Sequence, residues 1–343
     1  MNNPLHYNVR SYNALYVVLV ACGWVVGALF CAAHTSGQER AIGEVREIER
    51  GELKTDALDL FPSELVDFVP DSNGVLFTGA GPGNWDAHIR ERGWILHEGD
   101  TFHMWYTGFV DDSSPMKLGY ATSFDGIHWT RYANNPIYSE HWIEDMMVVR
   151  HDGTYYMFAE GKDDRSQLLT SVDAISWKRV GQLDVRKKDG DPIEAGPFGT
   201  PTAWFEKGVW YLFYERSDLG IWLATSQDMK VWTNVQDEPV ISLGPAGAYD
   251  EQQVALNQIV KHNGRYYAYY HAAGARPEGA QKRLWCTCVA TSEDLIHWDK
   301  YDKNPLLPLE ANKSSGIVVH DGPQTLLYTM HDQVRRHVPR TAK

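Results

Sequence analysis

The sequence contains little cysteine. Only four of its 343 residues are cysteine, and Cys22 and Cys31 lie in an apolar N-terminal run. The other two, Cys286 and Cys288, are two positions apart in a run of strand type, a spacing whose geometry rarely suits a mutual disulfide. No metal-ligand pattern surrounds them. We therefore expect buried free thiols, no disulfide framework and no cysteine metal site.

Positive charge is also scarce. The chain has 32 Lys and Arg against 45 Asp and Glu, a net charge of −13, and no dense basic run. Binding to nucleic acid needs a basic face, so we exclude nucleic acid as a partner. The glycine-rich residues 79–83 lack the helix and the downstream Lys or acid of a phosphate-binding loop. No nucleotide cofactor is expected.

The N-terminus carries an export signal. Residues 14–33 form a run of twenty residues without charge, preceded by Arg10 and followed by a polar stretch. This length suits a signal peptide or a single membrane anchor, and small residues near Cys31 offer a cleavage site. A lipoprotein box ending at Cys22 is less well supported, because the apolar run continues beyond it. We expect an exported protein that is secreted, periplasmic or membrane-anchored, and that contacts the membrane only through residues 1–33.

A seven-residue spacing, Ser-x-Asp-x-x-x-Trp, recurs along the chain. Its four copies follow one another at Trp-to-Trp steps of 48, 55 and 66 residues. They are Ser123/Asp125/Trp129, Ser171/Asp173/Trp177, Ser226/Asp228/Trp232 and Ser292/Asp294/Trp298. A period of this size indicates one supersecondary unit repeated around an axis. Asp can cap the turn of a hairpin, and Trp can wedge between neighbouring sheets.

A second pattern, a turn followed by a short aromatic strand, precedes each copy. Asp-Gly and Asn-Gly pairs accept the positive φ angles that tight hairpins need, so each instance predicts two inner strands. The instances lie at residues 99–106, 152–158, 207–214 and 263–270, with a weaker fifth at 321–328.

Five such units predict an all-β fold, a five-bladed β-propeller, over residues 75–335. Residues 34–74 form a linker and lead-in, and residues 336–343 a tail. Little chain remains after the fifth turn to finish the last blade. We therefore expect residues 75–78 to supply its missing strand and close the ring.

The repeats resemble the five-bladed propeller glycosidases of glycoside hydrolase families 43, 32 and 117. The resemblance covers about residues 75–335 and is carried by the aromatic strands and by the phrase from Gly119 to Trp129 followed by Asn135-Pro136-Ile137. It implies a carbohydrate substrate and a site at the mouth of the central channel. Two carboxyl groups are needed there, one protonated and one ionised. A structural ion in the channel remains open.

Carboxylates recur at one position of the repeat. Counting back from the aromatic strands aligns Arg92, Asp145, Thr200 and Leu256, and six residues earlier stand Asp86, Ser139, Glu194 and Asp250. We expect Asp86 to act as base or nucleophile and Glu194 as acid, with Asp250 as the rival acid. Close carboxylates raise one another's pKa, so one can stay protonated near neutral pH.

The family resemblance implies a second register. Asp145 matches the second-blade Asp that positions substrate and tunes the acid's pKa in family 43, whereas Arg92 and Gly199 stand where that family has its first-blade Asp and third-blade Glu. Family 117 enzymes use a His as acid, which makes His88 and His271 further candidates.

The remaining candidates would bind substrate. Even spacing along a strand brings His88, Arg90 and Arg92 to the side of Asp86, where they could bind sugar hydroxyls or a planar anion. Pairing of these arginines with Glu91 or Glu144 is equally open. Trp85 and Trp142 could stack on a sugar face. The full set is Trp85, His88, Arg90, Arg92, Trp142, Glu144 and His271.

The sequence thus predicts an exported glycoside hydrolase. Two alternatives stay open. One is a carbohydrate-binding propeller without catalysis, suggested by Arg92 and Gly199 at the two departing positions. The other is a protein-interaction propeller at the cell surface.

Overall fold

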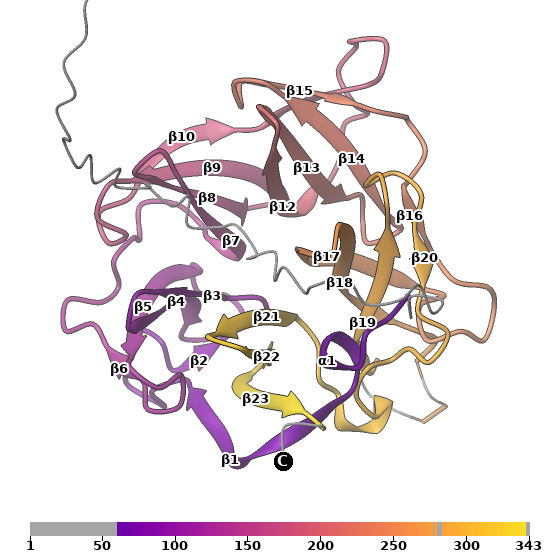
Figure 1. Cartoon of the computed structure of the whole chain (residues 1–343). Coiled ribbons are helices and arrows are strands. Elements are labelled where there is room, and N and C mark those ends of the chain that lie inside the picture. The colour runs from indigo at the N-terminus through magenta and orange to yellow at the C-terminus, as the bar shows by residue number, and fades with distance from the viewer. Residues whose placement is uncertain (1–59, 277, 280–282, 341–343) are drawn as a thin grey trace, which may run out of the picture. The chain divides into compact units, whose positions relative to one another are not determined.

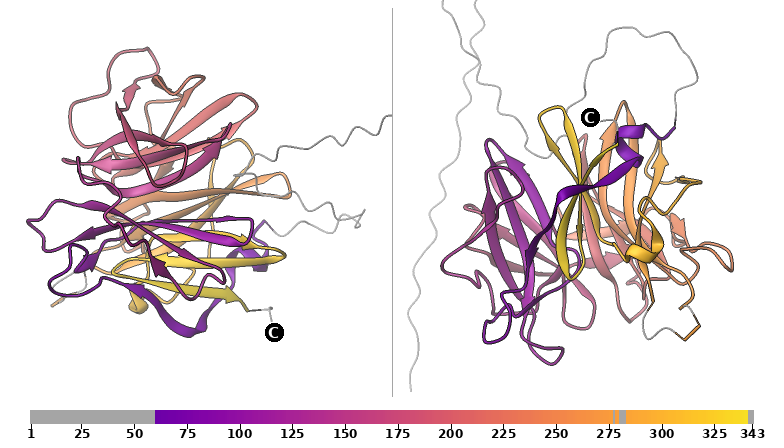
Figure 2. Two further views of the ribbon diagram at one scale, coloured as in Figure 1. Left: turned by 90° about the vertical axis from the view of Figure 1, so that its left-hand side faces the viewer. Right: turned by 90° about the horizontal axis from the view of Figure 1, so that it is seen from below.

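The computed structural model describes residues 60–276, 278–279 and 283–340. They form five sheets arranged around a central axis, antiparallel except for the pair β11 and β15, which confirms the predicted all-β, five-bladed propeller (Figure 1). Figure 2 shows the blades from two further sides. Each blade runs from an inner strand beside the axis to an outer strand at the rim, so residues at the ends of inner strands meet at the channel.

The first three blades follow one another in chain order. Blade 1 contains β2 (His88–Ile89), β3 (Trp94–Glu98), β4 (Thr101–Phe109), β5 (Lys117–Ser123) and β6 (Thr130–Arg131). Blade 2 contains β7 (Glu144–His151), β8 (Thr154–Gly161), β9 (Arg165–Ser171) and β10 (Lys178–Gln182). Blade 3 contains β11 (Asp184–Arg186), β12 (Gly199–Glu206), β13 (Val209–Glu215), β14 (Gly220–Ser226), β15 (Val231–Asn234) and β16 (Ile241–Ser242).

The last two blades complete the ring. Blade 4 contains β17 (Gln253–His262), β18 (Arg265–Ala273), β19 (Trp285–Ser292) and β20 (Asp299–Lys300). Blade 5 contains β21 (Gly316–Asp321), β22 (Gln324–Met330), β23 (Gln333–Pro339) and β1 (Phe68–Thr78). Two short helical turns, α1 (Ser63–Val66) and η1 (Leu309–Ala311), lie outside the sheets.

The inner hairpins form where the sequence predicts them. Asp152 and Gly153 have φ angles of 47° and 74°, and Asn263 and Gly264 have 49° and 81°. Positive φ at both central residues is the geometry of a type I′ turn, whose twist matches that of the strands. These turns therefore fix the register of the inner strand pairs.

The repeated Asp and Trp have the structural roles expected of them. Asp125 Oδ1 accepts hydrogen bonds from the backbone N–H groups of Ile127 and His128, both at 2.8 Å. Each Trp of blades 2 to 4 packs against an aromatic ring of the preceding blade. These pairs are Trp177 with Trp105 at 6.2 Å, Trp232 with Phe158 at 5.9 Å and Trp298 with Phe213 at 6.2 Å between ring centroids.

The N-terminal strand closes the ring. β1 pairs antiparallel with β23, with Val75 opposite Arg335 and Phe77 opposite Val334, which confirms the expected role of residues 75–78. The pairing begins earlier than expected, at Phe68, and β23 continues to Pro339. The last blade is thus built from both ends of the described chain.

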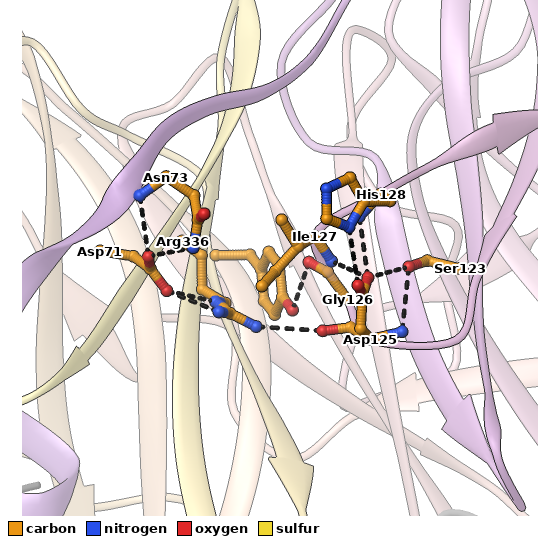
Figure 3. A network of polar contacts seen from close by, with 9 residues as sticks. Asp71, Asn73, Ser123, Asp125, Gly126, Ile127, His128 and Arg336 are labelled. Carbon is orange, nitrogen blue, oxygen red and sulfur yellow. Dashed lines mark hydrogen bonds and ion pairs between the residues drawn. The ribbon is translucent and has the colours of Figure 1, made fainter.

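A polar network joins this last blade to blade 1 (Figure 3). The Arg336 guanidinium lies 2.6 Å from Asp71 Oδ2 and donates to the backbone oxygen of Asp125 at 3.1 Å. The Tyr328 hydroxyl donates to the Gly126 oxygen at 3.0 Å. These contacts join the turn of blade 1 to β22 and β23 of blade 5 and, through Arg336, to β1. The network therefore stabilises the closed ring.

Other predictions concern the ends of the chain and the cysteines. The predicted signal peptide or anchor lies outside the described residues. In the part of the chain that the structure describes, no helix is long and apolar enough to cross a membrane. Cys286 and Cys288 are free and buried, as expected, with their sulfur atoms 3.6 Å apart.

We predict that Arg336→Ala lowers the free energy of unfolding by about 3 kcal/mol, because it leaves the largely buried Asp71 carboxylate unpaired. Arg340→Ala is the matched control, since its ion pair with Asp67 also joins the two ends but is exposed, and should cost less than about 1 kcal/mol. Urea unfolding measures both. Equal losses would contradict the role given to Arg336.

Candidate active site

The inner strands of four blades bend at one equivalent position. Arg92, Asp145, Thr200 and Ser315 have φ angles of 51°, 46°, 46° and 55°, although none is glycine. The strand pairing of blades 2 and 3 shifts register at this point. Such bulges redirect side chains and are strained, and they concentrate at functional sites. Here they surround the channel.

Arg92 is fully buried at this level of the channel. Its guanidinium donates to the backbone oxygen of Asp145 in blade 2, and to the oxygen of Pro201 at 2.8 Å and the hydroxyl of Thr202 in blade 3. Its backbone N–H donates to Met330 of blade 5 at 2.8 Å. Burial lowers the pKa of Arg92 to about 10, and nearby carboxylates oppose the fall. Arg92 thus connects four blades around the axis.

A cavity of about 200 Å³ opens beside Arg92. Six carboxylates line it, namely Glu91, Asp145, Glu160, Asp164, Glu215 and Asp218. The other side chains are Arg90, Thr200, Ser217, His271, Trp285, Ser314, Ser315 and His331. All five blades contribute to this lining, which places the cavity at the channel mouth.

Asp145 is one of the residues that line the cavity. Its Oδ1 atom is buried and has no hydrogen-bond partner among the described residues. Burial raises the pKa of the Asp145 carboxyl well above its usual range; Glu91 adds to the rise and Arg92 opposes it. Burial therefore favours the protonated form of this carboxyl.

Glu160 lies at the end of β8 and is buried. Its Oε2 atom accepts the backbone N–H of Thr200 at 2.8 Å, which fixes the carboxyl across the boundary between blades 2 and 3. Burial raises the pKa of Glu160 well above its usual range, and the charges of Asp145 and Glu144 add to the rise.

Glu215 holds the equivalent place at the end of β13. Its Oε1 atom accepts the backbone N–H of Gly199 at 2.8 Å, and its Oε2 atom accepts that of Asp218. Burial, with the charge of Asp218 beside it, raises the pKa of Glu215 to about 7. Two backbone donors favour the ionised form, so this carboxyl is poised to exchange a proton at neutral pH.

His271 completes this series at the equivalent place in blade 4. Its Nδ1 atom lies 2.7 Å from the Asn257 amide oxygen, and its ring packs edge-on against Trp285 at 5.3 Å. Burial lowers the pKa of His271 to about 3, and the charge of Arg92 lowers it further. The imidazole is therefore neutral, with Nδ1–H donated to Asn257 and Nε2 left as an acceptor.

Arg90 lines the cavity and pairs with acids, which is one of the two roles that the sequence left open for it; its binding of a ligand stays a prediction. Its guanidinium contacts Glu144 and lies 3.6 Å from Glu91. Burial by itself lowers the pKa of Arg90, but the charges of Glu91 and Glu144 outweigh it and raise the pKa. Glu144 is buried and also accepts the indole N–H of Trp142.

Two carboxylates predicted from the repeat lie away from this cavity. Asp86 is buried in an ion pair with Arg131 at 2.9 Å and accepts the Tyr106 hydroxyl at 3.0 Å. Asp250 is buried in an ion pair with Lys300 at 2.6 Å. Each is engaged at the lead-in to its blade, so the structure does not bring Asp86 and Asp250 together with Asp145.

Three further candidates also lie outside the cavity lining. Glu194 is exposed, with 77% of its side-chain surface accessible, and pairs with Lys187 at 2.7 Å. Trp85 is half-buried and stacks on Tyr106 at 6.0 Å. His88 is exposed at the edge of blade 1. Of the predicted set, the cavity brings together Asp145, Arg90 and His271, with Arg92 beneath them.

Sequence reasoning missed Glu160 and Glu215, although a signal was present. Each stands seven residues after the glycine of its hairpin turn, as His271 does after Gly264. The end of the second strand of each blade is thus a repeat-equivalent channel position. The search for carboxylates before the first strand did not examine it.

The cavity can carry out proton transfer. Burial raises the pKa of Asp145, Glu160 and Glu215, that of Glu215 to about 7, and the same lining contains a neutral imidazole and an Arg. Pairs of carboxyls whose environments separate their protonation are the requirement for cleaving a glycosidic bond. Across residues 60–340 as described, no three His, Cys, Asp or Glu side chains are arranged to hold a metal ion.

No protein-family model matches the chain. Among curated proteins it is similar to a 1,2-β-oligomannan phosphorylase of Thermoanaerobacter sp., at 30% identity over 200 residues, which are 52% of this chain and 62% of that protein. It is also 26% identical over 138 residues to an uncharacterized protein of Mycobacterium tuberculosis, covering 37% and 46%. The matches thus span less than two thirds of these relatives.

Solved structures match over much more of the chain. A candidate glycoside hydrolase from Parabacteroides distasonis has a TM-score of 0.63 and 16% identity, covering 82% of this chain and 97% of that one. A β-1,2-mannobiose phosphorylase from Listeria innocua, solved with β-1,2-mannobiose, has a TM-score of 0.61 and 15% identity, covering 79% and 96%. A structure from the GH130 family of mannoside phosphorylases, which contains hydrolases that target β-1,2-mannosidic linkages, has a TM-score of 0.59 and 16% identity, covering 81% and 97%. The predicted relation to propeller glycosidases therefore holds for the fold.

Proposed function

We propose that this protein hydrolyses the glycosidic bond of a β-mannoside in the cavity at the channel mouth. The observation that carries the proposal is the meeting of Asp145, Glu160 and Glu215 in one cavity, each with a raised pKa. The choice of sugar is supported by the names of the similar proteins, which act on β-1,2-linked mannosides.

Asp145 is the general acid in this proposal. Burial raises its pKa and so favours the protonated carboxyl that must deliver a proton to the leaving oxygen, and no described residue hydrogen-bonds its Oδ1 atom. The bulge at φ 46° and the Arg92 contact to its carbonyl fix its backbone. A positioned donor of this kind needs little reorganisation during the reaction.

Glu215 is the general base. Its two oxygens accept backbone N–H groups of Gly199 and Asp218, which hold the carboxylate in one orientation while leaving further lone pairs for water. Its pKa of about 7 lets it accept a proton from water at neutral pH. Burial and the charge of Asp145 raise the pKa of Glu160, which lines the same cavity.

The charge of the cavity favours water over inorganic phosphate as the attacking group. Six carboxyl side chains and a single Arg line it, and those carboxylates that are ionised repel an anion. Phosphate at neutral pH carries one to two negative charges. Water carries none and is activated by the carboxylates that repel phosphate.

Phosphorolysis is the second candidate. It is favoured by the similarity to an oligomannan phosphorylase and by Arg90 and His331, two lining residues that could donate hydrogen bonds to a phosphate. The two reactions differ in their products, because hydrolysis releases free mannose and phosphorolysis releases mannose 1-phosphate.

We predict that the purified protein releases mannose from β-1,2-mannobiose in phosphate-free buffer, at a rate that added phosphate does not increase. Ion chromatography of the products measures this. Formation of mannose 1-phosphate only when phosphate is present would establish the phosphorylase instead. If the disaccharide bound and neither product formed, the protein would be a carbohydrate-binding propeller without catalysis.

We predict that Asp145→Asn and Glu215→Gln each lower kcat by about 10²- to 10⁴-fold, the usual contribution of a positioned acid or base. Wild-type kcat should rise with pH through about 7 as Glu215 ionises, and Glu215→Gln should abolish that limb. Glu238→Gln, at an exposed site, is the control. If Glu194→Gln abolished activity and Glu215→Gln retained it, the assignment of Glu215 would be wrong. Glu194, the acid predicted from the repeat, would then be the catalytic carboxyl.

We predict that Glu215 also makes stability depend on pH. Its pKa of about 7 in the folded protein exceeds the ordinary 4.5, so the folded state keeps a proton that the unfolded state releases. That contribution is complete below the unfolded pKa and is lost as pH rises through about 7. Between pH 5 and pH 8 the wild type should lose about 2–3 kcal/mol more than Glu215→Gln in urea unfolding. If the free energies of unfolding of the two proteins changed equally between pH 5 and pH 8, Glu215 would have no raised pKa.

A further inference from the structure

A larger cavity of about 690 Å³ lies on blade 2, outside the channel. Three cationic side chains line it, Lys162, Arg165 and Arg179, against two carboxylates, Glu140 and Asp163. Among the described residues, none of the three cations lies within 4.0 Å of a carboxylate. In a chain of net charge −13, cationic side chains thus outnumber carboxylates in this lining.

A buried glutamine positions two of the residues that line this cavity. Gln167 is only 2% exposed, and its Nε2 atom donates to the backbone oxygen of Trp142 at 2.7 Å. Its Oε1 atom accepts from Nε of Arg179 at 2.6 Å. One amide therefore fixes both the segment that carries the Trp142 ring and the Arg179 guanidinium. The terminal nitrogens of Arg179 remain to bind a ligand, because Gln167 engages only Nε.

The turn between β8 and β9 contributes residues to the lining of both cavities. Glu160 and Asp164 line the channel cavity, whereas Gly161, Lys162 and Asp163 between them line the larger one. This hairpin turn is held in a left-handed conformation, with φ of 62° at Asp163 and 51° at Asp164. A ligand that passes over the turn can therefore occupy both cavities at once.

A second connection runs through Trp142. Its ring lines the larger cavity, and its indole N–H is bonded to Glu144, which in turn pairs with Arg90 in the channel cavity. An aromatic ring beside fixed guanidinium and ammonium groups is suited to a sugar that stacks on its C–H face and carries an anion.

We propose that the larger cavity binds a second sugar residue of the substrate and selects one that bears an oxyanion, whether carboxylate, sulfate or phosphate ester. Arg179, Lys162 and Arg165 bind the oxyanion, and Trp142 supports the ring. This inference rests on the proposed function, since it extends the glycan from the channel cavity. The uncharged glycosidic linkage then lies among the carboxylates of the channel cavity. The oxyanion lies among the cationic side chains of the larger cavity.

Titration calorimetry with the whole protein tests the inference without turnover. The probes are mannose 6-phosphate, mannose 6-sulfate, glucuronic acid and neutral mannose. We expect at least one oxyanion probe to bind about tenfold or more tightly than mannose, and the comparison among the three identifies the group. Binding should weaken as salt is added.

Variants locate the binding. Arg179→Gln and Lys162→Gln should each weaken the preferred probe by about 3- to 10-fold. Lys178→Gln is the matched control, because Lys178 is the exposed neighbour of Arg179 but does not line the cavity. Equal binding of all four probes, an absence of binding, or an equal loss in Lys178→Gln would overturn the inference.

The test separates this inference from the proposed function. If β-1,2-mannobiose is hydrolysed but no oxyanion is preferred, the channel assignment stands and the larger cavity has no such role. If an oxyanion probe binds through Arg179 but no glycoside is cleaved, the larger cavity stands and the hydrolase does not.

Discussion

The site depends on one buried guanidinium. Arg92 is buried beside the channel cavity and forms no ion pair with a carboxylate among the described residues; its terminal nitrogens donate to backbone and hydroxyl oxygens of blades 2 and 3. Its charge nevertheless acts on the acids above it, because the interior screens charge poorly. Without Arg92, the pKa of Asp145 would rise further and the inner strands would lose a common partner. The Arg92 guanidinium thus joins the inner strands and also influences the pKa of the carboxyls at the channel mouth.

The fold could be predicted because its signals are local and repeated. Turns such as Asp152-Gly153 need positive φ, and the Asp of each Ser-x-Asp-x-x-x-Trp copy caps its own hairpin, so both patterns are visible over a few residues. Closure by β1 also followed from counting strands. The extent of that closure did not, because the contacts of Arg336 with Asp71 and Asp125 join distant residues.

The site could be predicted only in part. Asp145, Arg90 and His271 lie at the cavity because repeat register places them near the channel. Asp86 and Asp250 share a register as well, but cationic partners from later in their blades, Arg131 and Lys300, engage them away from the cavity. A repeated carboxylate can thus belong to a repeated structural contact. Which of the two it is depends on partners about 45 to 50 residues away, and no local pattern shows them.

The most direct test of the account is a crystal structure of Glu215→Gln with β-1,2-mannobiose. The account predicts the disaccharide in the channel cavity, with its glycosidic oxygen within about 3 Å of the Asp145 carboxyl and a water beside residue 215. A sugar bound beside Asp86 or Asp250, with the channel cavity left free of it, would contradict the central claim that these carboxylates form the active site.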